Sequence, residues 1–259
     1  MEIKLVDVSY NKSNYDLTLK SKYIIGITGK NKEILMNILN LNINYKGNIY
    51  INDNKIDKDN INKYRKKISL IEKELKINTT VKEYMEYIIK YKRLEIKDEN
   101  KKMIDSLRIV GLNKTYLDRY YNTLSNSDKK LISISIGLLS NPDILIFDDI
   151  FIGLDTRNQR KLYRLFNKLK DQYNKLIIIF SNNSNILYKY TTKIVFLYDN
   201  EVLIEGKTDS LYTKVDYLKE YKFDIPDIVL FTYKARKKGI KLSYHKDIRD
   251  IIKDIYKHV

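Results

Sequence analysis

The chain of 259 residues contains no cysteine, no tryptophan and only two prolines. Without cysteine it can form neither a disulfide framework nor a thiolate metal site, which suits a reducing cytosol. Long apolar runs are also missing, because the longest aliphatic stretch, Leu176 to Phe180, is far too short to span a bilayer. Glu2, Lys4 and Asp7 interrupt the first apolar stretch, so we expect no secretory segment there.

Acidic residues are few relative to basic ones: 33 Asp and Glu stand against 49 Lys and Arg, for a net charge of +16. Such a charge suits nucleic acid or anionic lipid as a partner. The lysines are spread along the chain, however, and the densest basic run is Lys234-Ala235-Arg236-Lys237-Lys238. A nucleic-acid-binding stripe needs several such runs. We therefore expect no nucleic-acid partner and assign no function to the charge alone.

The order of apolar patterns predicts an α/β fold. Short apolar runs predict buried strands that alternate with helical patterns, at 23–27, 68–71, 144–147, 176–180 and 193–197. Buried parallel strands alternating with helices predict a doubly wound sheet, with ligands at the carboxyl ends of its strands. The polar-rich stretch of about 80–140 reads as a helical insertion, and the chain after residue 205 is mainly helical. We therefore expect a domain of residues 1–205 followed by a helical extension of residues 206–259.

The first candidate site is the segment Gly26-Ile27-Thr28-Gly29-Lys30-Asn31-Lys32-Glu33, which lies between a predicted strand and a predicted helix. It keeps the first Gly and the Lys of the phosphate-loop pattern G-x-x-x-x-G-K-[ST] in register. In such a loop, backbone N–H groups and a helix N-terminus bind phosphate oxygens while the Lys supplies charge. The alternative is an ordinary strand-to-helix turn with a solvated lysine.

Two substitutions alter the chemistry of this loop. Asn31 replaces the second Gly; it tolerates left-handed backbone angles, but we expect its side chain to crowd an approaching phosphate. Glu33 replaces the Ser or Thr and places a carboxylate beside a polyphosphate. That carboxylate could ligate Mg²⁺ or repel the nucleotide, and Lys30 is a candidate to offset its charge.

A second set of motifs is more specific. Leu124-Ser125-Asn126-Ser127-Asp128, a helix, the strand that ends in Asp148-Asp149, and Gly153-Leu154-Asp155 follow one another in the sequence. This order resembles the ABC ATPases, with their LSGGQ signature, their strand ending in Asp-Glu and their GLD loop. The resemblance implies a P-loop NTPase (ABC ATPase) fold with a mixed sheet, a helical subdomain and a small C-terminal helical extension. It also implies ATP and Mg²⁺ as cofactors.

The same resemblance implies roles for individual residues. Asp148 would hold Mg²⁺, and Asp149 would replace the Glu that activates the attacking water. Asp is one methylene shorter than Glu, so its carboxylate reaches less far. Asn182 falls at the switch His position, where it can donate a hydrogen bond but cannot become cationic.

Three further positions follow from the resemblance. Lys73, or Glu72 in the other possible alignment, takes the place of the Gln that couples the metal to the transmembrane partner. Ser125 keeps the signature hydroxyl, although Asn126-Ser127-Asp128 replaces Gly-Gly-Gln. Tyr10 could stack on adenine, and the alternative is that it simply packs at the end of a strand.

The tail narrows the resemblance. Asp224-Ile225-Pro226-Asp227-Ile228, then Lys238-Gly239-Ile240 and a last helix at about 245–256, resemble the C-terminal extension of the ATPase subunits of energy-coupling factor transporters. This implies a peripheral subunit at the cytoplasmic face of the membrane. Its partners would be a second ABC ATPase subunit, in a homodimer or a heterodimer, and a transmembrane T component. Two functions stay open: an ATP-binding subunit of an importer with slow hydrolysis, and an inactive pseudo-ATPase that supports an intact subunit.

Overall fold

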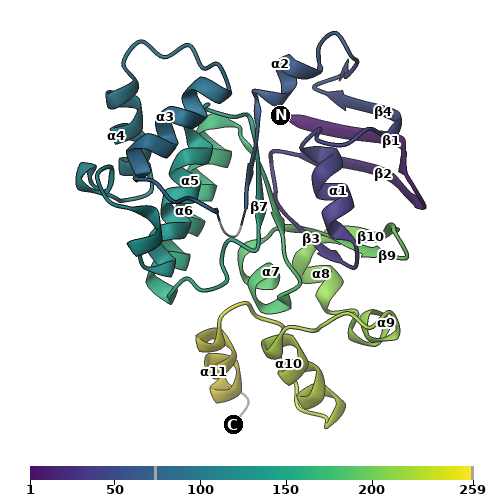
Figure 1. The fold of residues 1–259 in the computed structure, drawn as a ribbon. Coiled ribbons are helices and arrows are strands. Elements are labelled where there is room, and N and C mark those ends of the chain that lie inside the picture. Colours follow the sequence, from purple (N-terminus) through teal and green to yellow (C-terminus); the bar gives the residue numbers. More distant parts are fainter. Residues whose placement is uncertain (73–74, 258–259) are drawn as a thin grey trace.

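The computed structural model describes residues 1–72 and 75–257. Its helices and strands form an α/β fold with two sheets, a group of helices on one side and a helical tail (Figure 1). None of the helices in the described residues is long and apolar enough to cross a membrane. The predicted α/β class with a mixed sheet is confirmed.

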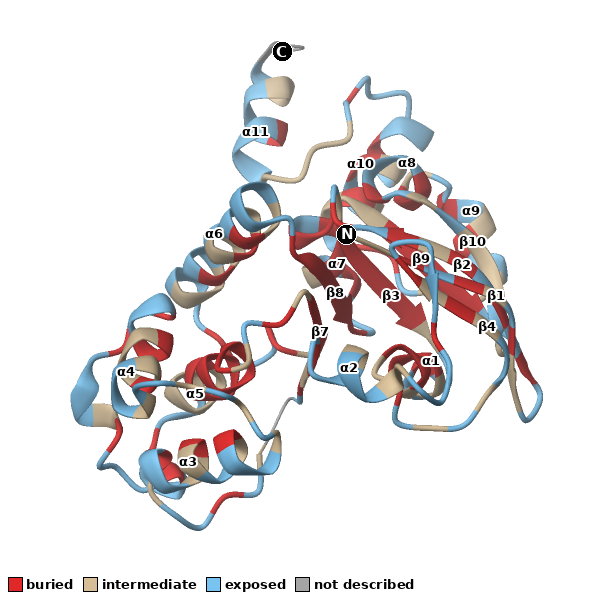
Figure 2. Cartoon of the chain, turned by 90° about the horizontal axis from the view of Figure 1, so that it is seen from above, coloured by how far each residue is buried: buried red, intermediate tan, exposed pale blue. Residues whose placement is uncertain are grey.

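The larger sheet has six strands in the order β10-β9-β3-β8-β7-β6. Its members are β3 (Ile24–Gly29), β6 (Ile68–Ile71), β7 (Ile144–Asp148), β8 (Leu176–Phe180), β9 (Lys193–Tyr198) and β10 (Glu201–Lys207). All neighbours are parallel except β10, which pairs antiparallel with β9. The central strands β3, β7 and β8 are almost wholly buried because helices and the second sheet cover both faces (Figure 2).

The strands that open the chain do not join the parallel sheet. They form a separate antiparallel sheet in the order β2-β1-β4-β5. Its members are β1 (Glu2–Tyr10), β2 (Ser13–Lys20), β4 (Lys46–Ile51) and β5 (Asn54–Lys55). Alternating burial in β2 leaves one apolar face, and this face shares a core with helix α1 (Lys32–Leu39).

The helical insertion lies beside β6 and β7, on the opposite side from the small sheet (Figure 1). It contains α3 (Val81–Tyr91), α4 (Glu99–Ile109) and α5 (Asn126–Leu138). Thr80 and Glu83 form a capping box that starts α3. Helix α5 packs closely on β6, since a Cβ added to Gly137 would lie 2.7 Å from the side chain of Ile71. The signature segment is therefore fixed to the sheet through α5.

The remaining helices cover the sheet or build the tail. They are α2 (Ile61–Arg65), α6 (Thr156–Tyr173), α7 (Ser184–Tyr190), α8 (Thr208–Tyr212), α9 (Val215–Glu220), α10 (Asp227–Lys237) and α11 (Ile248–Lys257). Strand β10 runs two residues past the predicted boundary at residue 205, and the tail helices begin at Thr208.

The tail is joined to the larger domain by specific contacts. Ser184 donates a hydrogen bond of 2.6 Å to Asp224, and the amide of Asn185 donates one of 2.9 Å to Asp227. The rings of Tyr188 and Tyr212 pack edge to face, and burial raises the pKa of Tyr188 to about 12. The first part of the tail is therefore held on α7, directly after the switch segment.

Candidate nucleotide site at the phosphate loop

The phosphate loop connects β3 to α1, and a close approach to β9 fixes its shape. Gly29 has φ +132, and a Cβ added there would lie 2.1 Å from the carbonyl oxygen of Leu197. Gly26 is also tight, since an added Cβ would meet Leu187 and Thr191 at 3.0 Å. Helix α1 begins at Lys32, and the N–H groups at the start of a helix point out of its N-terminal end, although that of Ile34 donates to the Asn31 carbonyl at 3.0 Å. This end of α1 therefore offers the donors that bind a phosphate.

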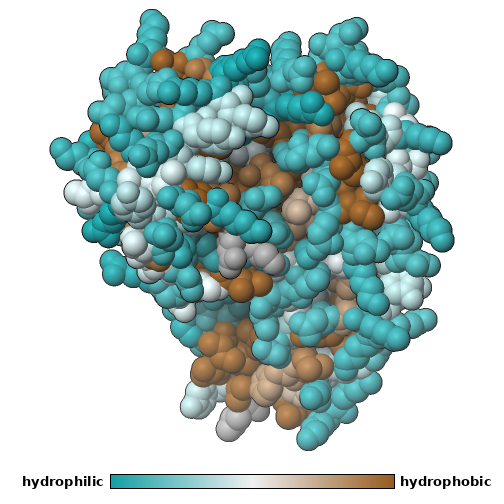
Figure 3. All heavy atoms as spheres, viewed as in Figure 1, coloured by the Kyte–Doolittle hydropathy of each residue, from teal (hydrophilic) through white to brown (hydrophobic). Residues whose placement is uncertain are grey.

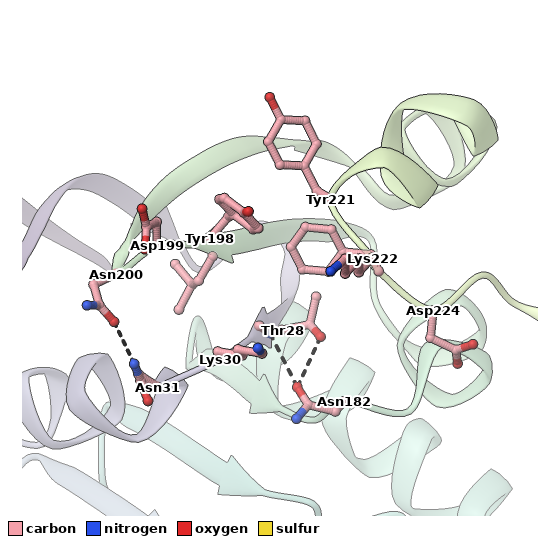
Figure 4. Close-up of a pocket in the computed structure, with 13 residues that line it drawn as sticks. Thr28, Lys30, Asn31, Asn182, Tyr198, Asp199, Asn200, Tyr221, Lys222 and Asp224 are labelled. Atoms are coloured by element: carbon pink, nitrogen blue, oxygen red, sulfur yellow. Dashed lines mark hydrogen bonds between the residues drawn. The ribbon is translucent and has the colours of Figure 1, made fainter.

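Asn31 stands in the left-handed conformation, with φ 56 and ψ 23. Asparagine is one of the few residues other than glycine that adopts these angles at small cost. Its side-chain amide donates a hydrogen bond of 2.7 Å to Oδ1 of Asn200, in the turn between β9 and β10 (Figure 4). The side chain is thus turned toward this hairpin, and the loop is tied to it.

Lys32 and Glu33 form an ion pair inside the loop. The Lys32 ammonium lies 3.2 Å from Oε1 of Glu33. Lys32 is only 6% exposed, whereas the side chain of Glu33 is 61% exposed. A buried charge needs a partner, and Glu33 provides one without any ligand. The offset of the Glu33 charge by Lys30 stays a prediction, and Lys32 is an ion-pair partner that the sequence did not suggest.

The switch segment after β8 contacts the phosphate loop directly. Oδ1 of Asn182 accepts hydrogen bonds from Thr28 Oγ1 and from the backbone N–H of Gly29, each at 3.3 Å (Figure 4). The sequence suggests Asn182 as a donor, and here its oxygen accepts. This contact brings the carboxyl ends of β3 and β8 together, where a doubly wound sheet binds its ligand.

The two acids after β7 lie at the same edge of the sheet. Asp148 pairs with Phe180 across β7 and β8, and the backbone N–H of Asp149 donates to the Phe180 carbonyl at 2.9 Å. The hydroxyl of Ser181 donates a hydrogen bond of 2.5 Å to Oδ1 of Asp149. Asp149 has φ 44, a left-handed backbone angle that Asp, like Asn, adopts more readily than most residues. These contacts hold the Asp149 carboxylate in one orientation.

The phosphate loop borders a pocket of about 390 Å³ that the tail helps to close. The pocket is lined by Thr28, Gly29, Lys30, Asn31, Asn182, Leu197, Tyr198, Asp199, Asn200, Tyr221, Lys222, Phe223 and Asp224. Tyr198 and Tyr221 pack edge to face over it, with ring centroids 4.9 Å apart (Figure 4). Asn200 and the tail segment 221–224 were not predicted to line this pocket. Only a turn signal marks Asn200, and the tail motif that begins at Asp224 indicated a C-terminal extension, not a contact with the phosphate loop.

The signature serine lies away from the phosphate loop. Ser125 is the N-cap of α5, and its hydroxyl accepts the N–H of Asp128 at 3.1 Å. No recorded contact in the described part of the chain joins Ser125 to the loop. The helix behind it does reach the acids, because the Lys130 ammonium lies 3.5 Å from the Asp149 carbonyl.

Two other predicted residues are less informative. Tyr10 ends β1 and packs against the core of the small sheet and α1, as the packing alternative expects. Its contact with adenine stays a prediction. Lys73 lies outside the described residues, and its neighbour Glu72 is exposed.

The donor set fits a magnesium ion only in company with a nucleotide. The described residues contain no group of three or more His, Cys, Asp or Glu that could hold a metal. Mg²⁺ commonly binds through one or two carboxylates and takes its other ligands from phosphates and water. Asp148 and Glu33 are carboxylates of this kind, so most of the remaining ligands would come from the nucleotide.

The chain is similar in sequence to known proteins over more than half of its length. The family model described as ABC transporter matches residues 13–151, more than half of the chain. The chain is 31% identical over 153 residues to the energy-coupling factor transporter ATP-binding protein EcfA2 of Mycoplasma mobile, a match that covers 59% of this chain and 49% of that protein. It is 27% identical over 232 residues to EcfA2 of Clostridium acetobutylicum, covering 86% of this chain and 80% of that protein.

Solved structures share the fold. The dimeric ABC transporter cassette MJ0796 has a TM-score of 0.69 at 24% identity and covers 80% of this chain and 98% of its own. The cbiO1 protein of Clostridium perfringens has a TM-score of 0.71 at 19% identity, and the match covers 89% of this chain and 98% of that protein. From its phosphate loop, its strand order and the family model, this chain belongs to the ABC transporter family and resembles the ATP-binding subunits of energy-coupling factor transporters.

Proposed function

We propose that this chain binds ATP with Mg²⁺ and serves as the ATP-binding subunit of an energy-coupling factor-like membrane transporter. The observation that carries the proposal is the preformed loop at the N-terminus of α1. In it, Gly29 lies against Leu197, Asn31 holds the left-handed turn and Lys32 is buried at the helix start. Such a loop presents N–H donors and one lysine to a polyphosphate.

The roles that we propose for individual residues are those that the family resemblance implies. Residues 26–33 would bind the phosphates, and Asp148 and Glu33 would supply carboxylate oxygens to the magnesium ion. Asp149 would act on the attacking water, and Asn182 would respond to the terminal phosphate. Ser125 would complete the site of a second subunit, because in this chain it lies apart from the loop.

The subunit's partners are part of the proposal. The EcfA2 relatives are named as ATP-binding proteins of energy-coupling factor transporters, and cbiO1 is described as part of the cbiONQ transporter complex. We propose that this chain likewise pairs with a second ABC ATPase subunit and docks on a transmembrane T component at the cytoplasmic face of the membrane. Residues 1–205 would form the ATPase domain and residues 206–259 the extension.

Titration with labelled ATP and Mg²⁺ tests nucleotide binding. Lys32→Ala should weaken binding by about 2 kcal/mol or more, roughly 30-fold, because it removes a buried charge from the phosphate. Lys55→Ala, an exposed lysine on the small sheet, is the matched control and should leave the affinity unchanged. Absence of detectable binding by the unmodified chain at millimolar ATP would overturn the proposal.

A pseudo-ATPase is the second candidate, and two contacts favour it. Glu33 neutralises Lys32, and Ser181 holds the Asp149 carboxylate through a hydrogen bond. The hydrogen bond from Ser181 occupies one oxygen of this carboxylate and fixes its orientation, so that oxygen is less available to a water molecule. Binding of ATP without phosphate release, measured with a partner subunit whose own phosphate-loop lysine is replaced by alanine, would select this candidate over a slow ATPase.

A further inference from the structure

The tail carries a basic segment for which the ATP site has no use. From Ile228 to Lys246 the sequence contains six Lys and Arg and no Asp or Glu. This segment includes most of α10, which ends at Lys237, and the turn that leads toward α11. The densest basic run of the chain is thus placed at the end of one helix.

Large apolar side chains are exposed beside this segment. Five of them lie on α10, α11 and the connection between the two: Phe231, Ile240, Ile248, Ile252 and Tyr256. Phe231 is 50% exposed and Tyr256 is 79% exposed. Figure 3 shows apolar side chains gathered at the end of the molecule where α10 and α11 lie. Exposed apolar side chains that gather in one place indicate a binding surface.

A hollow of about 770 Å³ lies within this surface. Its walls are Phe231, Lys234, Ala235, Lys237, Lys238, Ile240, Leu242 and Ile255. All the charged members of this lining are lysines, and the others are apolar. We refer to these eight residues as the tail groove.

The acids near the tail groove are already engaged. Oδ1 of Asp216 lies 3.8 Å from the Lys237 ammonium. Asp247 forms an ion pair with Arg249, and Asp250 forms one with Lys253, at the start of α11 or within it. Asp254 pairs with His245 and accepts the N–H of Ser243. By contrast, the structure records no ion pair for Lys234, Lys238 or Lys241 within residues 1–72 and 75–257. The rim of the groove therefore keeps an uncompensated positive charge.

We propose that the tail groove docks an acidic amphipathic helix of a different protein. Helix-in-groove recognition places the apolar face of a helix in such a hollow, and acidic residues flanking that face would meet Lys234 and Lys238. A second copy of this chain would bring the same lysines to the interface and repel them. A bilayer surface would not fill a concave hollow, and a nucleic acid would find only one aromatic ring in its lining.

The proposal goes beyond the proposed function, since the groove lies on α10 and α11 and shares no lining residue with the phosphate-loop pocket. It requires neither ATP nor a working Asp149. Failure of nucleotide binding and failure of tail docking are therefore separate results.

Fluorescence anisotropy with synthetic helices tests the proposal on the full chain. The probe is a labelled peptide of about four helical turns with Leu on one face and Glu on the other. The unmodified chain should bind it, and affinity should fall as salt is raised because the rim charges are exposed. Lys234→Glu with Lys238→Glu should weaken binding by about tenfold or more. Lys55→Glu with Lys58→Glu is the matched control, on exposed lysines far along the chain, and should bind like the unmodified protein.

A charge-swapped peptide with Lys in place of Glu gives the converse test. It should bind the Lys234→Glu, Lys238→Glu variant and not the unmodified chain. A Glu peptide with its apolar stripe scrambled should not bind either protein. The proposal would be overturned if the unmodified chain did not bind the Glu peptide. It would also be overturned if the Lys55, Lys58 double variant lost as much affinity for that peptide as the Lys234, Lys238 double variant. Sedimentation showing a dimer of this chain that Phe231→Asp dissociates would overturn it too, as would tighter binding to phosphatidylserine vesicles or single-stranded DNA than to the peptide.

Discussion

The hydroxyl of Ser181 donates a 2.5 Å hydrogen bond to Oδ1 of Asp149, and this contact links the switch segment to the proposed water-activating acid. The same switch segment reaches the phosphate loop one residue later, through Asn182. A change at the loop and a change at the acid are therefore mechanically connected through two adjacent residues. We therefore expect substitutions at Asp149 and at Ser181 to affect the rate of ATP hydrolysis together.

Asp149→Glu should raise the rate of ATP hydrolysis, measured as phosphate release with the partner subunit present. The longer side chain extends the carboxylate by one methylene toward the attacking water, and a well-placed general base contributes roughly 10²–10⁴-fold. Adding Ser181→Ala should raise the rate further, because the carboxylate then loses its competing hydrogen bond. Asp171→Glu, an exposed acid at the end of α6, is the control. An unchanged rate would place the limiting defect at Glu33 or Asn182 instead.

Without Mg²⁺, Glu33→Ser should tighten ATP binding by about tenfold, since it removes a carboxylate that competes with phosphate for the buried Lys32. Calorimetric titration with and without Mg²⁺ measures this change. Glu95→Ser alters an exposed acid elsewhere and should have no effect. With Mg²⁺ the gain should be smaller, because the variant also loses a carboxylate proposed to bind the metal. Tightening of the same size with and without Mg²⁺ would contradict the proposed role of Glu33 as a metal ligand.

Local patterns were enough to predict much of the fold. Five consecutive apolar residues predict β8 with the bounds that the structure has, because only a buried strand accommodates such a run. The second sheet was not predicted. In this sheet β1 pairs with β2, which follows it in the chain, and also with the more distant β4. Alternation of apolar and polar residues predicts a strand but does not identify the strand that pairs with it.

In the candidate site too, features set by local sequence were predictable and contacts between distant residues were not. Gly26, Lys32 and the strand-to-helix order are local, so a motif could reveal them. The hydrogen bond between Asn31 and Asn200 joins residues 169 positions apart, and neither local sequence contains a signal that predicts this contact. The pair of Lys32 with Glu33 was open to prediction as adjacent charges, but only the burial of Lys32 makes that pair consequential.

Gly29 provides the sharpest test of the loop, because the chain offers a matched glycine. Gly29 and Gly111 both have positive φ, +132 and +83, but an added Cβ lies 2.1 Å from the Leu197 carbonyl at the first and meets nothing within 4 Å at the second. Alanine at Gly111 should lower the free energy of unfolding by about 1 kcal/mol, from backbone strain alone. Alanine at Gly29 adds a clash with backbone and should cost about 3 kcal/mol or more.

Urea unfolding of both variants measures that difference, and ATP titration completes the comparison. Gly29→Ala should lose ATP binding, since the loop has to move away from β9 to relieve the clash. Gly111→Ala should retain it. Equal stability losses in the two variants would mean that the approach of Gly29 to Leu197 does not constrain the loop. Loss of binding in Gly111→Ala would mean that the effect arises from general destabilisation, because strain at Gly111 is far from any contact with the phosphate loop in the described residues.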